Sequence, residues 1–303
     1  MTDVLTGMRV FVTVVDTGSF AAAAEKLDLS RGMTSRYVAQ MESHLGVRLL
    51  NRTTRKLSLT GVGQDYYQRA VQVLGLVEEA ETAATSETAQ PRGTLRINAP
   101  LSFSALHLGH AITEYLQRFQ DVQVELSLVD REVKLVEEGF DLALRIANEV
   151  DPMLIARPLA PVRVVACASA RYLETHGMPE HPRDLARHNC LRYTNTRNSD
   201  EWHFHRGPEQ CQVAVQGNLQ GNNGDVLCNA AVAGLGVVLQ PTFMVYQLLN
   251  SGALLRVLDG WEPEHPTLNA VYANRRFLPL KTRSFIDFLV EYFAGKPYWD
   301  EGL

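Results

Sequence analysis

Hydrophobic and polar positions in the stretch 19–60 predict a compact arrangement of two short helices and a basic hairpin. Helical patterns cover 20–27 and 30–45, and a tight turn at 28–29 separates them. A serine precedes each helix as an N-cap, and Gly46 provides a stop for the second. Two short helices joined by a tight turn are typical of a helix-turn-helix.

The second of these helices is amphipathic, with one stripe expected to be buried and one polar face. The stripe recurs at i, i+4, i+7 and i+11 and consists of Thr34, Val38, Met41 and Leu45. The opposite face has little bulk and is led by two arginines. A major groove accepts such a helix, and Arg and Gln are suited to reading guanine and adenine edges. The expected DNA contacts from this helix are Ser30, Arg31, Gly32, Ser35, Arg36 and Gln40.

The stretch 47–59 alternates apolar positions on both sides of a basic tip, which predicts a hairpin, or wing, suited to phosphates and the minor groove. Its expected DNA contacts are Arg52, Thr53, Thr54, Arg55 and Lys56. From residue 31 to 56 five Arg and one Lys face a single acid, whereas from residue 61 onward 21 basic residues face 29 acidic ones. A basic island in an acidic chain indicates DNA binding. The alternative is a helical hairpin with an ordinary charged surface.

This segment resembles the N-terminal winged helix-turn-helix of LysR-type transcriptional regulators. The matching stretches are GSFAAAAEKL (18–27), the S-x-x-x-x-S-R run (30–36) and LGVRLLNRTTRKLSLT (45–60), followed by Gly61 and Gly63. The resemblance implies a sequence-specific DNA-binding regulator. The sequence departs from the family at Thr34 and at Gly32, where glycine in the first helical turn costs about 1 kcal/mol relative to alanine.

A long helix is predicted after the wing, from a cap at Thr60 to about Thr85, with an apolar seam along it. The seam either packs against its own DNA-binding domain or pairs with the same helix of a second subunit. We favour pairing, because two recognition helices about 34 Å apart can read a two-fold site. The resemblance likewise implies a dimerising linker helix, and also tetramers. The seam consists of Val62, Tyr66, Ala70, Val73, Val77 and Ala84, and the polar stretch 86–93 is predicted to be a hinge.

From residue 94 onward strand and helix patterns alternate, which predicts an α/β class with parallel sheet covered by helices. The predicted strands are 94–99, 122–129, 141–146, 163–168, 191–193, 212–215, 237–239 and 268–273. The predicted helices are 102–119, 131–138, 170–176, 225–233, 242–249 and 280–293.

The C-terminal pattern fits two lobes, and the chain is expected to cross between them near Pro161 and Pro266. It resembles the effector-binding domain of the same family, itself similar to periplasmic solute-binding proteins, in GTLRINAP (93–100), EEGFDLALRI (137–146) and GNNGDVLCNAAVAGLGVVLQP (221–241), among other stretches. The predicted domains are a winged helix-turn-helix at 1–60, a linker helix and hinge at 61–90, and an effector-binding domain at 91–303. Lobe 1 is expected at 91–161 and 266–303, and lobe 2 at 162–265.

A small-molecule effector is expected beyond the carboxyl ends of the strands, between the lobes. There Ser102 offers a hydroxyl and free backbone N–H groups at a helix N-terminus, suited to an anionic or polar ligand group, unless it serves as a plain N-cap. Asn222 and Asn223 are more often turn residues than ligand contacts, and Trp202 is equally suited to a core. The candidate set is Leu101, Ser102, Phe103, Ala147, Asn148, Thr194, Asn195, Trp202, Asn222, Asn223, Gly224, Gln240 and Pro241.

The remaining chemistry of the chain argues against other kinds of site. Its four cysteines lack C-x-x-C spacing, so we expect no metal site and no paired redox motif, but buried thiols in a reducing cytoplasm. We expect no cofactor other than the effector. The first residues do not form a secretion signal and no apolar run is long enough to span a membrane, which predicts a cytoplasmic protein.

Three functions compete for this sequence. The leading one is a transcription regulator whose effector changes the arrangement of subunits, hence the spacing or bend of promoter DNA and the access of RNA polymerase. An α/β enzyme is disfavoured, because G-x-S-x-G, H-E-x-x-H and phosphate-loop motifs are absent from the sequence. An architectural DNA-binding protein is disfavoured, because wrapping DNA does not require a solute cleft.

Overall fold

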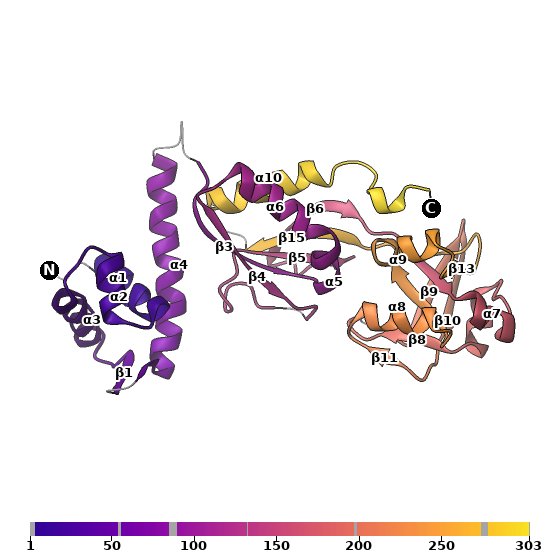
Figure 1. Ribbon diagram of the computed structural model, residues 1–303, viewed down its shortest axis with the longest axis horizontal. Helices are drawn as coiled ribbons and strands as arrows, with labels where there is room; N and C mark the ends of the chain where they lie inside the picture. Colours follow the sequence, from indigo (N-terminus) through magenta and orange to yellow (C-terminus); the bar gives the residue numbers. More distant parts are fainter. Residues whose placement is uncertain are drawn as a thin grey trace. The chain divides into compact units, whose positions relative to one another are not determined.

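The computed structural model describes residues 4–53, 56–84, 90–131, 133–196, 199–273 and 278–302 (Figure 1). Apart from two short segments, the chain divides between Gln90 and Pro91 into two compact units. The first unit contains α1 (Val4–Thr17), α2 (Phe20–Lys26), α3 (Arg31–Leu45), the strands β1 (Leu50–Thr53) and β2 (Lys56–Leu59), and α4 (Gly61–Ala84). The predicted helix-turn-helix and its hairpin are therefore confirmed.

The caps of the helix-turn-helix form as its sequence predicts. The Ser19 hydroxyl accepts hydrogen bonds from the first backbone N–H groups of α2, and the Ser30 hydroxyl accepts from Met33 N at 3.2 Å. Gly46 ends α3 in the left-handed region with φ of 70°. These three positions fix where each helix begins or ends, because a capping side chain or a left-handed glycine satisfies backbone groups that the helix leaves open.

The core of the first unit joins α1, α3 and the start of the wing. Its fully buried side chains are Val10, Phe11, Val14, Ala23, Val38, Met41, Leu49 and Leu50. Thr34, Val38 and Met41 of the predicted stripe are buried, but Leu45 is 38% exposed, so its predicted burial is wrong. Leu45 is the last residue of α3, and its exposed neighbours Gly46 and Val47 place that end of the helix at the surface of the unit.

Helix α4 uses part of its apolar seam within its own unit. Tyr66 lies against Phe11 with 5.7 Å between ring centroids, and Ala70 is buried. For these two residues the first interpretation of the seam holds. Val62 is 54% exposed and Val73 is also exposed, so pairing with a second subunit stays a prediction for them. The side chain of Ala84 and the hinge residues 86–89 lie outside the described residues.

Two five-stranded sheets form the second unit. The first has the order β4-β3-β5-β15-β6, and the second the order β11-β8-β12-β7-β13. The strands of the first are β3 (Gly93–Ala99), β4 (Val122–Leu128), β5 (Leu142–Ala147), β6 (Leu154–Pro161) and β15 (Thr267–Ala273). Those of the second are β7 (Val164–Ala168), β8 (Cys190–Tyr193), β11 (Gln220–Gly221), β12 (Val237–Pro241) and β13 (Leu255–Arg256).

Both sheets are mixed, which corrects the expectation of parallel sheet. Strand β3 is parallel to β4 and β5, but β15 is antiparallel to β5 and β6 because it returns from the other lobe. In the second sheet β12 is parallel to β8 and antiparallel to β7. A further three-stranded sheet has the order β10-β9-β14, with β9 (Glu201–Arg206), β10 (Glu209–Ala214) and β14 (Glu262–Pro263). Strands β6 and β9 have no counterpart among the predicted strands.

Helices cover these sheets. A continuous helix consists of α5 (Leu101–Phe103), the π-helical segment η1 (Ser104–Leu108) and α6 (Gly109–Arg118), and it packs on α10 (Leu280–Tyr292) through the rings of Tyr115 and Phe285, 4.8 Å apart. The second sheet carries α7 (Ala170–His176), α8 (Gly224–Val232) and α9 (Thr242–Asn250), and 3-10 turns lie at Pro182–Arg187 and Tyr298–Asp300.

The helix predicted at 131–138 is not formed by the described residues of that segment. Val133 and Leu135 are both buried there, with an exposed residue between them. Burial of every second residue requires extended or turn backbone, because residues two apart on a helix face different directions. The contact of these two side chains with the sheet therefore overrides the helical pattern.

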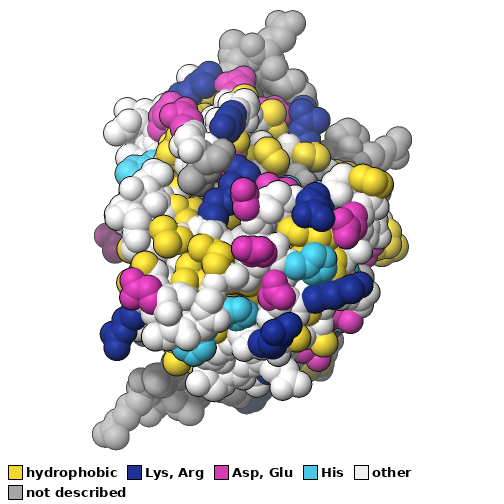
Figure 2. Space-filling view, turned by 90° about the vertical axis from the view of Figure 1, so that its right-hand side faces the viewer, with side chains coloured by type: hydrophobic (Ala, Val, Ile, Leu, Met, Phe, Trp, Pro, Cys, Tyr) yellow, Lys and Arg dark blue, Asp and Glu magenta, His cyan; other side chains and the backbone are white. Residues whose placement is uncertain are grey.

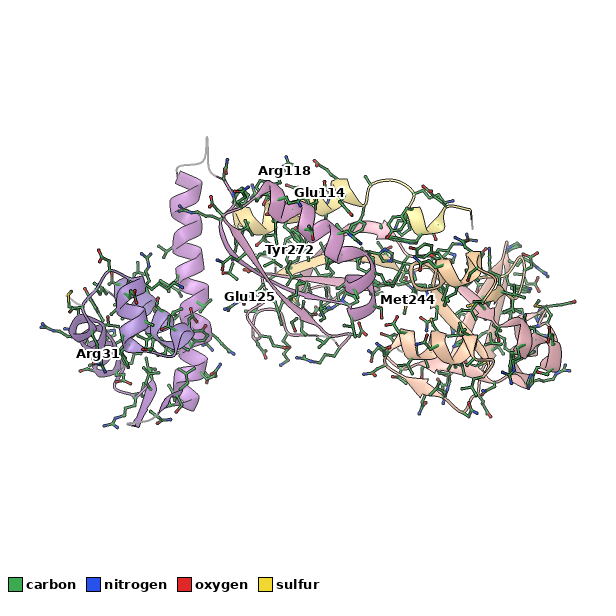
Figure 3. All side chains as sticks on the ribbon, in the orientation of Figure 1. Arg31, Glu114, Arg118, Glu125, Met244 and Tyr272 are labelled. Carbon is green, nitrogen blue, oxygen red and sulfur yellow. The ribbon has the colours of Figure 1, made fainter. Side chains whose placement is uncertain are left out.

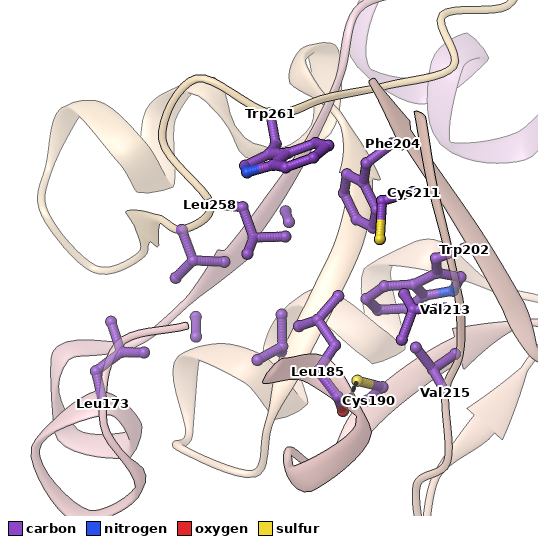
Figure 4. Packing of buried hydrophobic residues seen from close by; sticks show 14 of the residues in the cluster. Leu173, Leu185, Cys190, Trp202, Phe204, Cys211, Val213, Val215, Leu258 and Trp261 are labelled. Carbon is purple, nitrogen blue, oxygen red and sulfur yellow. Dashed lines mark hydrogen bonds between the residues drawn. The ribbon is translucent and has the colours of Figure 1, made fainter. Parts of the chain in front are cut away.

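Lobe 2 has one hydrophobic core between α8, α9 and the five-stranded sheet, and another between the five-stranded and three-stranded sheets, whose packing Figure 4 shows. Aromatic side chains of β9 and Trp261 pack there with Leu185, Cys190 and Val213. Outside this core, the face of lobe 2 drawn in Figure 2 has basic, acidic and histidine side chains interspersed among uncharged ones.

Candidate DNA-binding surface and effector site

The polar face of α3 lies on the surface of the first unit. Arg31, Gly32, Arg36 and Gln40 are exposed, Ser35 is half-buried, and Ser30 is exposed while its hydroxyl caps the helix. Arg31 projects outward from α3 in Figure 3. The first turn of α3 contains no acidic residue, so its arginines are not neutralised from within that turn. This surface has the charge and outline that contact with a nucleic acid requires.

The wing is attached to the helices by contacts of Glu42, which sequence reasoning missed, and by contacts of Thr60, whose predicted role as a helix cap is confirmed. Glu42 of α3 accepts hydrogen bonds through Oε1 from Leu49 N at 2.9 Å and Leu50 N at 3.1 Å. Thr60 donates its hydroxyl to Arg48 O at 2.8 Å and accepts from Gly63 N at 2.9 Å. Glu42, the only acid in the basic stretch, thus has a structural role: it joins the reading helix α3 to the wing. The clue in the sequence was its isolation among basic residues.

Gly63 allows α4 to approach the strand that it supports. A Cβ at this position would lie 2.0 Å from Leu49 O, a distance that no side chain can occupy. At Gly61 and Gly32 no comparable obstacle exists: a Cβ at Gly61 would meet nothing within 4 Å, and one at Gly32 would lie 3.9 Å from Ser30 Oγ. Gly63 is therefore a packing requirement, whereas Gly32 leaves open space on the reading face.

The wing residues themselves are only partly described. Arg52 and Thr53 end β1 and Lys56 begins β2, paired antiparallel across the hairpin. Thr54 and Arg55 at the tip lie outside the described residues, as do the side chains of 52, 53 and 56. Their contacts with DNA stay a prediction.

In lobe 1 the three residues after β3 have three different environments. Leu101 is exposed, and its N–H donates to Asp130 Oδ1 at 3.0 Å. Ser102 is 8% exposed, and its hydroxyl donates to Asp225 Oδ2 at 2.6 Å. The N-cap of α5 is Pro100, so plain N-capping by Ser102 is excluded. Phe103 is fully buried beside Phe243, in an aromatic cluster that also contains His107, Phe293 and Trp299.

The two candidates after β5 lie at a separate place. Ala147 and Asn148 line a pocket of about 420 Å³ together with residues of β6 and β15. Asn148 donates to Glu264 Oε2 at 3.2 Å. The lining of this pocket includes neither Ser102 nor a residue of lobe 2 strands, so the structure does not bring these candidates together with those after β3.

Lobe 2 candidates divide into core, cap and crevice residues. Trp202 is 5% exposed and lies inside the core beside Leu185 and Val213, so it is a core anchor and not a ligand contact (Figure 4). Asn223 is the N-cap of α8 and accepts from Val226 N at 3.1 Å. The exposed candidates are Thr194, Asn195 and Asn222, while Pro241 precedes α9 as its N-cap.

Gln240 and Gly224 lie close together at the carboxyl end of β12. Gln240 is 3% exposed, and a Cβ at Gly224 would lie 3.0 Å from Gln240 Oε1 and 2.7 Å from Met244 Cε. Gly224 directly precedes Asp225, which holds Ser102. The structure therefore links Ser102 to the start of α8 through Asp225 and places Gln240 beside Gly224. Asp225 is a residue that sequence reasoning did not select.

Comparison with known proteins identifies both units. Residues 5–64 match the bacterial regulatory helix-turn-helix domain of the lysR family, and residues 88–294 match the LysR substrate binding domain. The chain belongs to the LysR family of transcriptional regulators. The resemblance seen in its motifs is confirmed, as are the DNA-binding and effector-binding domains and the function of a transcriptional regulator.

Relatives of this LysR-type regulator span almost its whole length. An uncharacterized HTH-type transcriptional regulator of Haemophilus influenzae is 36% identical over 279 residues, which are 92% of this chain and 97% of the relative. A HTH-type transcriptional repressor of Pseudomonas aeruginosa, PA14_22550, is 34% identical and covers 97% of this chain and 94% of its own. The structure of CrgA, a LysR-type regulator from Neisseria meningitidis, matches with a TM-score of 0.61 and 32% identity, over 96% of this chain and 99% of CrgA.

The four cysteines of this LysR-type regulator are free and buried, as predicted. Burial raises the pKa of the Cys190 thiol to about 12. Burial and the nearby charge of Asp225 raise the pKa of Cys228 to about 12, and burial raises that of Cys167 further. Within the described residues no group of His, Cys, Asp and Glu could hold a metal ion, and no helix is long and apolar enough to cross a membrane.

Proposed function

We propose that this LysR-type regulator reads promoter DNA with the exposed face of α3 and the wing, and senses a small molecule in the crevice between its lobes. The observation that carries the first part is the exposure of Arg31 and Arg36 on a helix whose first turn contains no acid, in a chain that is otherwise acidic. A uniformly charged coating protein would not concentrate its basic residues in this way.

In this proposal the residues of the DNA surface have two kinds of role. Arg31, Arg36 and Gln40 contact base edges in the major groove, with Ser30, Gly32 and Ser35 beside them. The wing residues 52–56 contact phosphates, which strengthens binding to every sequence alike. Loss of a base contact therefore relaxes selectivity, and loss of a phosphate contact lowers affinity and its dependence on salt.

The regulator acts as a dimer, and as a tetramer built from two dimers. Support for the dimer comes from α4, whose Val62 and Val73 are exposed although they belong to the apolar seam. A dimer doubles the reading surface and matches two-fold sites in DNA. The proposed domain boundaries are 1–60, 61–90 and 91–303. Within the last domain the chain passes from one lobe to the other near Pro161 and returns near Pro266.

The effector, in this proposal, binds one arrangement of the subunits better than another. Without such a difference in affinity it could not shift the equilibrium between them. The change in arrangement alters the bend or spacing of promoter DNA and the access of RNA polymerase in the cytoplasm. The chain performs no catalysis of its own.

The decisive experiment measures selectivity of the purified full-length protein by fluorescence anisotropy on its promoter and on scrambled duplex DNA. Arg36→Ala is expected to lower the ratio of the two affinities by about 5- to 150-fold, the equivalent of one good base contact. Arg183→Ala, an exposed arginine in lobe 2, is the matched control and should leave the ratio unchanged. An Arg36→Ala protein with full selectivity contradicts the assignment of α3 as the reading helix.

A further inference from the structure

Among the hydrogen bonds that join the two lobes of the effector domain, a short one connects residues 123 positions apart. Ser102 in the first turn of α5 donates its hydroxyl to Asp225 in the first turn of α8, at 2.6 Å. Ser102 is almost fully buried, whereas Asp225 keeps an exposed side chain. A carboxylate can accept about four hydrogen bonds, so Asp225 has capacity for further donors from the crevice.

A second carboxylate lies at the start of α5, the helix that contains Ser102. Asp130 follows β4 and accepts a hydrogen bond from Leu101 N at 3.0 Å. The charge of Asp130 also acts on Tyr193, the last residue of β8 in lobe 2. The pKa of Tyr193 is raised mainly by burial and in addition by the negative charge of Asp130. A helix N-terminus ordinarily attracts an anion. Here two carboxylates of the chain, Asp130 and Asp225, already accept the hydrogen bonds of Leu101 N and the Ser102 hydroxyl.

Gln240, close to the residue before Asp225, provides a second and independent observation. Its side chain is 3% exposed at the carboxyl end of β12, with Oε1 against Gly224, the residue before Asp225. Its Nε2 has no hydrogen-bond partner within the described part of the chain. An amide N–H buried without an acceptor is costly, and an acceptor supplied by a ligand would remove this cost.

We propose that the effector is a small cationic amine that also bears an oxygen acceptor. Its ammonium group binds Asp225 beside Ser102, and its oxygen accepts a hydrogen bond from Gln240 Nε2. Asp130, which accepts the hydrogen bond from Leu101 N, adds negative potential at the same helix start and disfavours simple carboxylates. This inference rests on the proposed function, since it takes the crevice between the lobes as the effector site. Of the anionic or polar group expected at Ser102 and the helix start, it excludes the anionic one.

The test uses the full-length protein and a matched panel of probes. Ethanolamine, glycinamide and benzylamine are compared with glycolate, malonamate and benzoate by thermal shift and isothermal titration at pH 7.5. The first two amines carry the oxygen acceptor and benzylamine lacks it. We expect ethanolamine or glycinamide to raise the melting temperature and to bind more tightly than benzylamine, while the acids have no effect.

Variants assign the binding to the named side chains. Asp225→Asn preserves shape and removes the charge, and it should weaken amine binding at least tenfold. Gln240→Leu should reduce the preference for ethanolamine or glycinamide over benzylamine. Asp287→Asn, on the exposed face of α10, is the control and should bind like the wild type.

Two outcomes overturn the inference about ligand class. One is that no amine of the panel binds; the other is that acids bind and bind more tightly to Asp225→Asn. In the second case the crevice remains an effector site, so the proposed function survives. The proposed function fails separately if an amine binds through Asp225 but leaves promoter anisotropy and footprint unchanged.

Discussion

In the DNA-binding unit the polar side chains assigned to the ligand lie on the surface, whereas in the effector unit they are largely buried. Arg31, Arg36 and Gln40 are exposed on α3, while Ser102 and Gln240 are buried in the effector unit. A DNA duplex is too large and stiff to be enclosed, so its contacts must be displayed in advance. A small solute is bound by enclosure, and its contacts can be hidden when the site is empty.

The two units also differ in how they treat the start of a helix. The first turn of α3 carries Arg31 and no acid, which adds positive charge to the partial charge of the helix N-terminus. The first turn of α5 is covered by the chain's own Asp130 and Asp225. The same backbone feature therefore favours a polyanion in one unit and a cation in the other, and the side chains around it decide which.

The largest expected effect concerns the buried thiols of the effector unit. Because burial raises the pKa of Cys190 and Cys228 to about 12, their thiolate fraction at pH 8 is about 10³-fold below that of an unperturbed thiol. Alkylation of the native protein by iodoacetamide, followed by mass spectrometry, should be slower by at least that factor than in 6 M guanidinium. Rapid labelling of Cys228 in the native protein would mean that the effector unit opens readily. The contrast between its buried residues and the exposed residues of the DNA-binding unit would then be wrong.

The next effect tests whether the exposed reading face depends on a buried joint. Gly63→Ala forces a Cβ against Leu49 O at 2.0 Å and should lower the opening free energy of the DNA-binding unit by about 1–3 kcal/mol. Hydrogen exchange of peptides from residues 4–84 measures this energy. Gly61→Ala is the matched control, because its Cβ meets nothing within 4 Å, and equal effects of the two substitutions would show that the close approach is unimportant.

A smaller effect is expected at Glu42, the acid beneath the reading face. Glu42→Gln keeps one oxygen acceptor but removes the charge that strengthens the bonds to Leu49 N and Leu50 N, at a cost of about 1 kcal/mol in the same exchange assay. Glu25→Gln, on the exposed side of α2, is the control and should change nothing. If Glu42→Gln leaves stability unchanged and only tightens DNA binding, Glu42 acts merely as a surface charge.

The same contrast between the units explains what the sequence could predict. Around the reading helix the decisive interactions are local: Ser30 caps a residue three positions on, and Gly46 stops the helix that it follows. Such contacts are written in neighbouring residues, so helix bounds and the exposed face could be predicted. Sequence reasoning missed contacts across the unit, such as Glu42 with the wing, and wrongly predicted burial of Leu45 at the end of α3.

In the effector unit the decisive contacts join residues far apart in the chain. Ser102 could be selected from its position after a strand, but its partner Asp225 could not, because the crossing of the chain between lobes places them together. For Trp202 the choice between a core position and a ligand contact stayed open for the same reason: its strand β9 had not been predicted, so the direction of its side chain was unknown. The helix predicted for 131–138 was wrong, because burial of Val133 and Leu135 outweighed the local helical pattern.

The smallest effect separates stability from recognition on the exposed face. Gly32 lies in the first turn of α3, where a methyl group would meet only Ser30 Oγ at 3.9 Å, so Gly32→Ala should stabilise the helix by about 0.5–1 kcal/mol through reduced freedom of the unfolded chain. Because the added methyl lies on the face assigned to the major groove, we expect promoter affinity to stay equal or fall while hydrogen exchange of α3 slows. A protein in which both stability and promoter affinity rise would indicate that the first turn is ordered only on DNA. In that case the reading surface would resemble the proposed effector site, because binding of the ligand would complete the structure in both units.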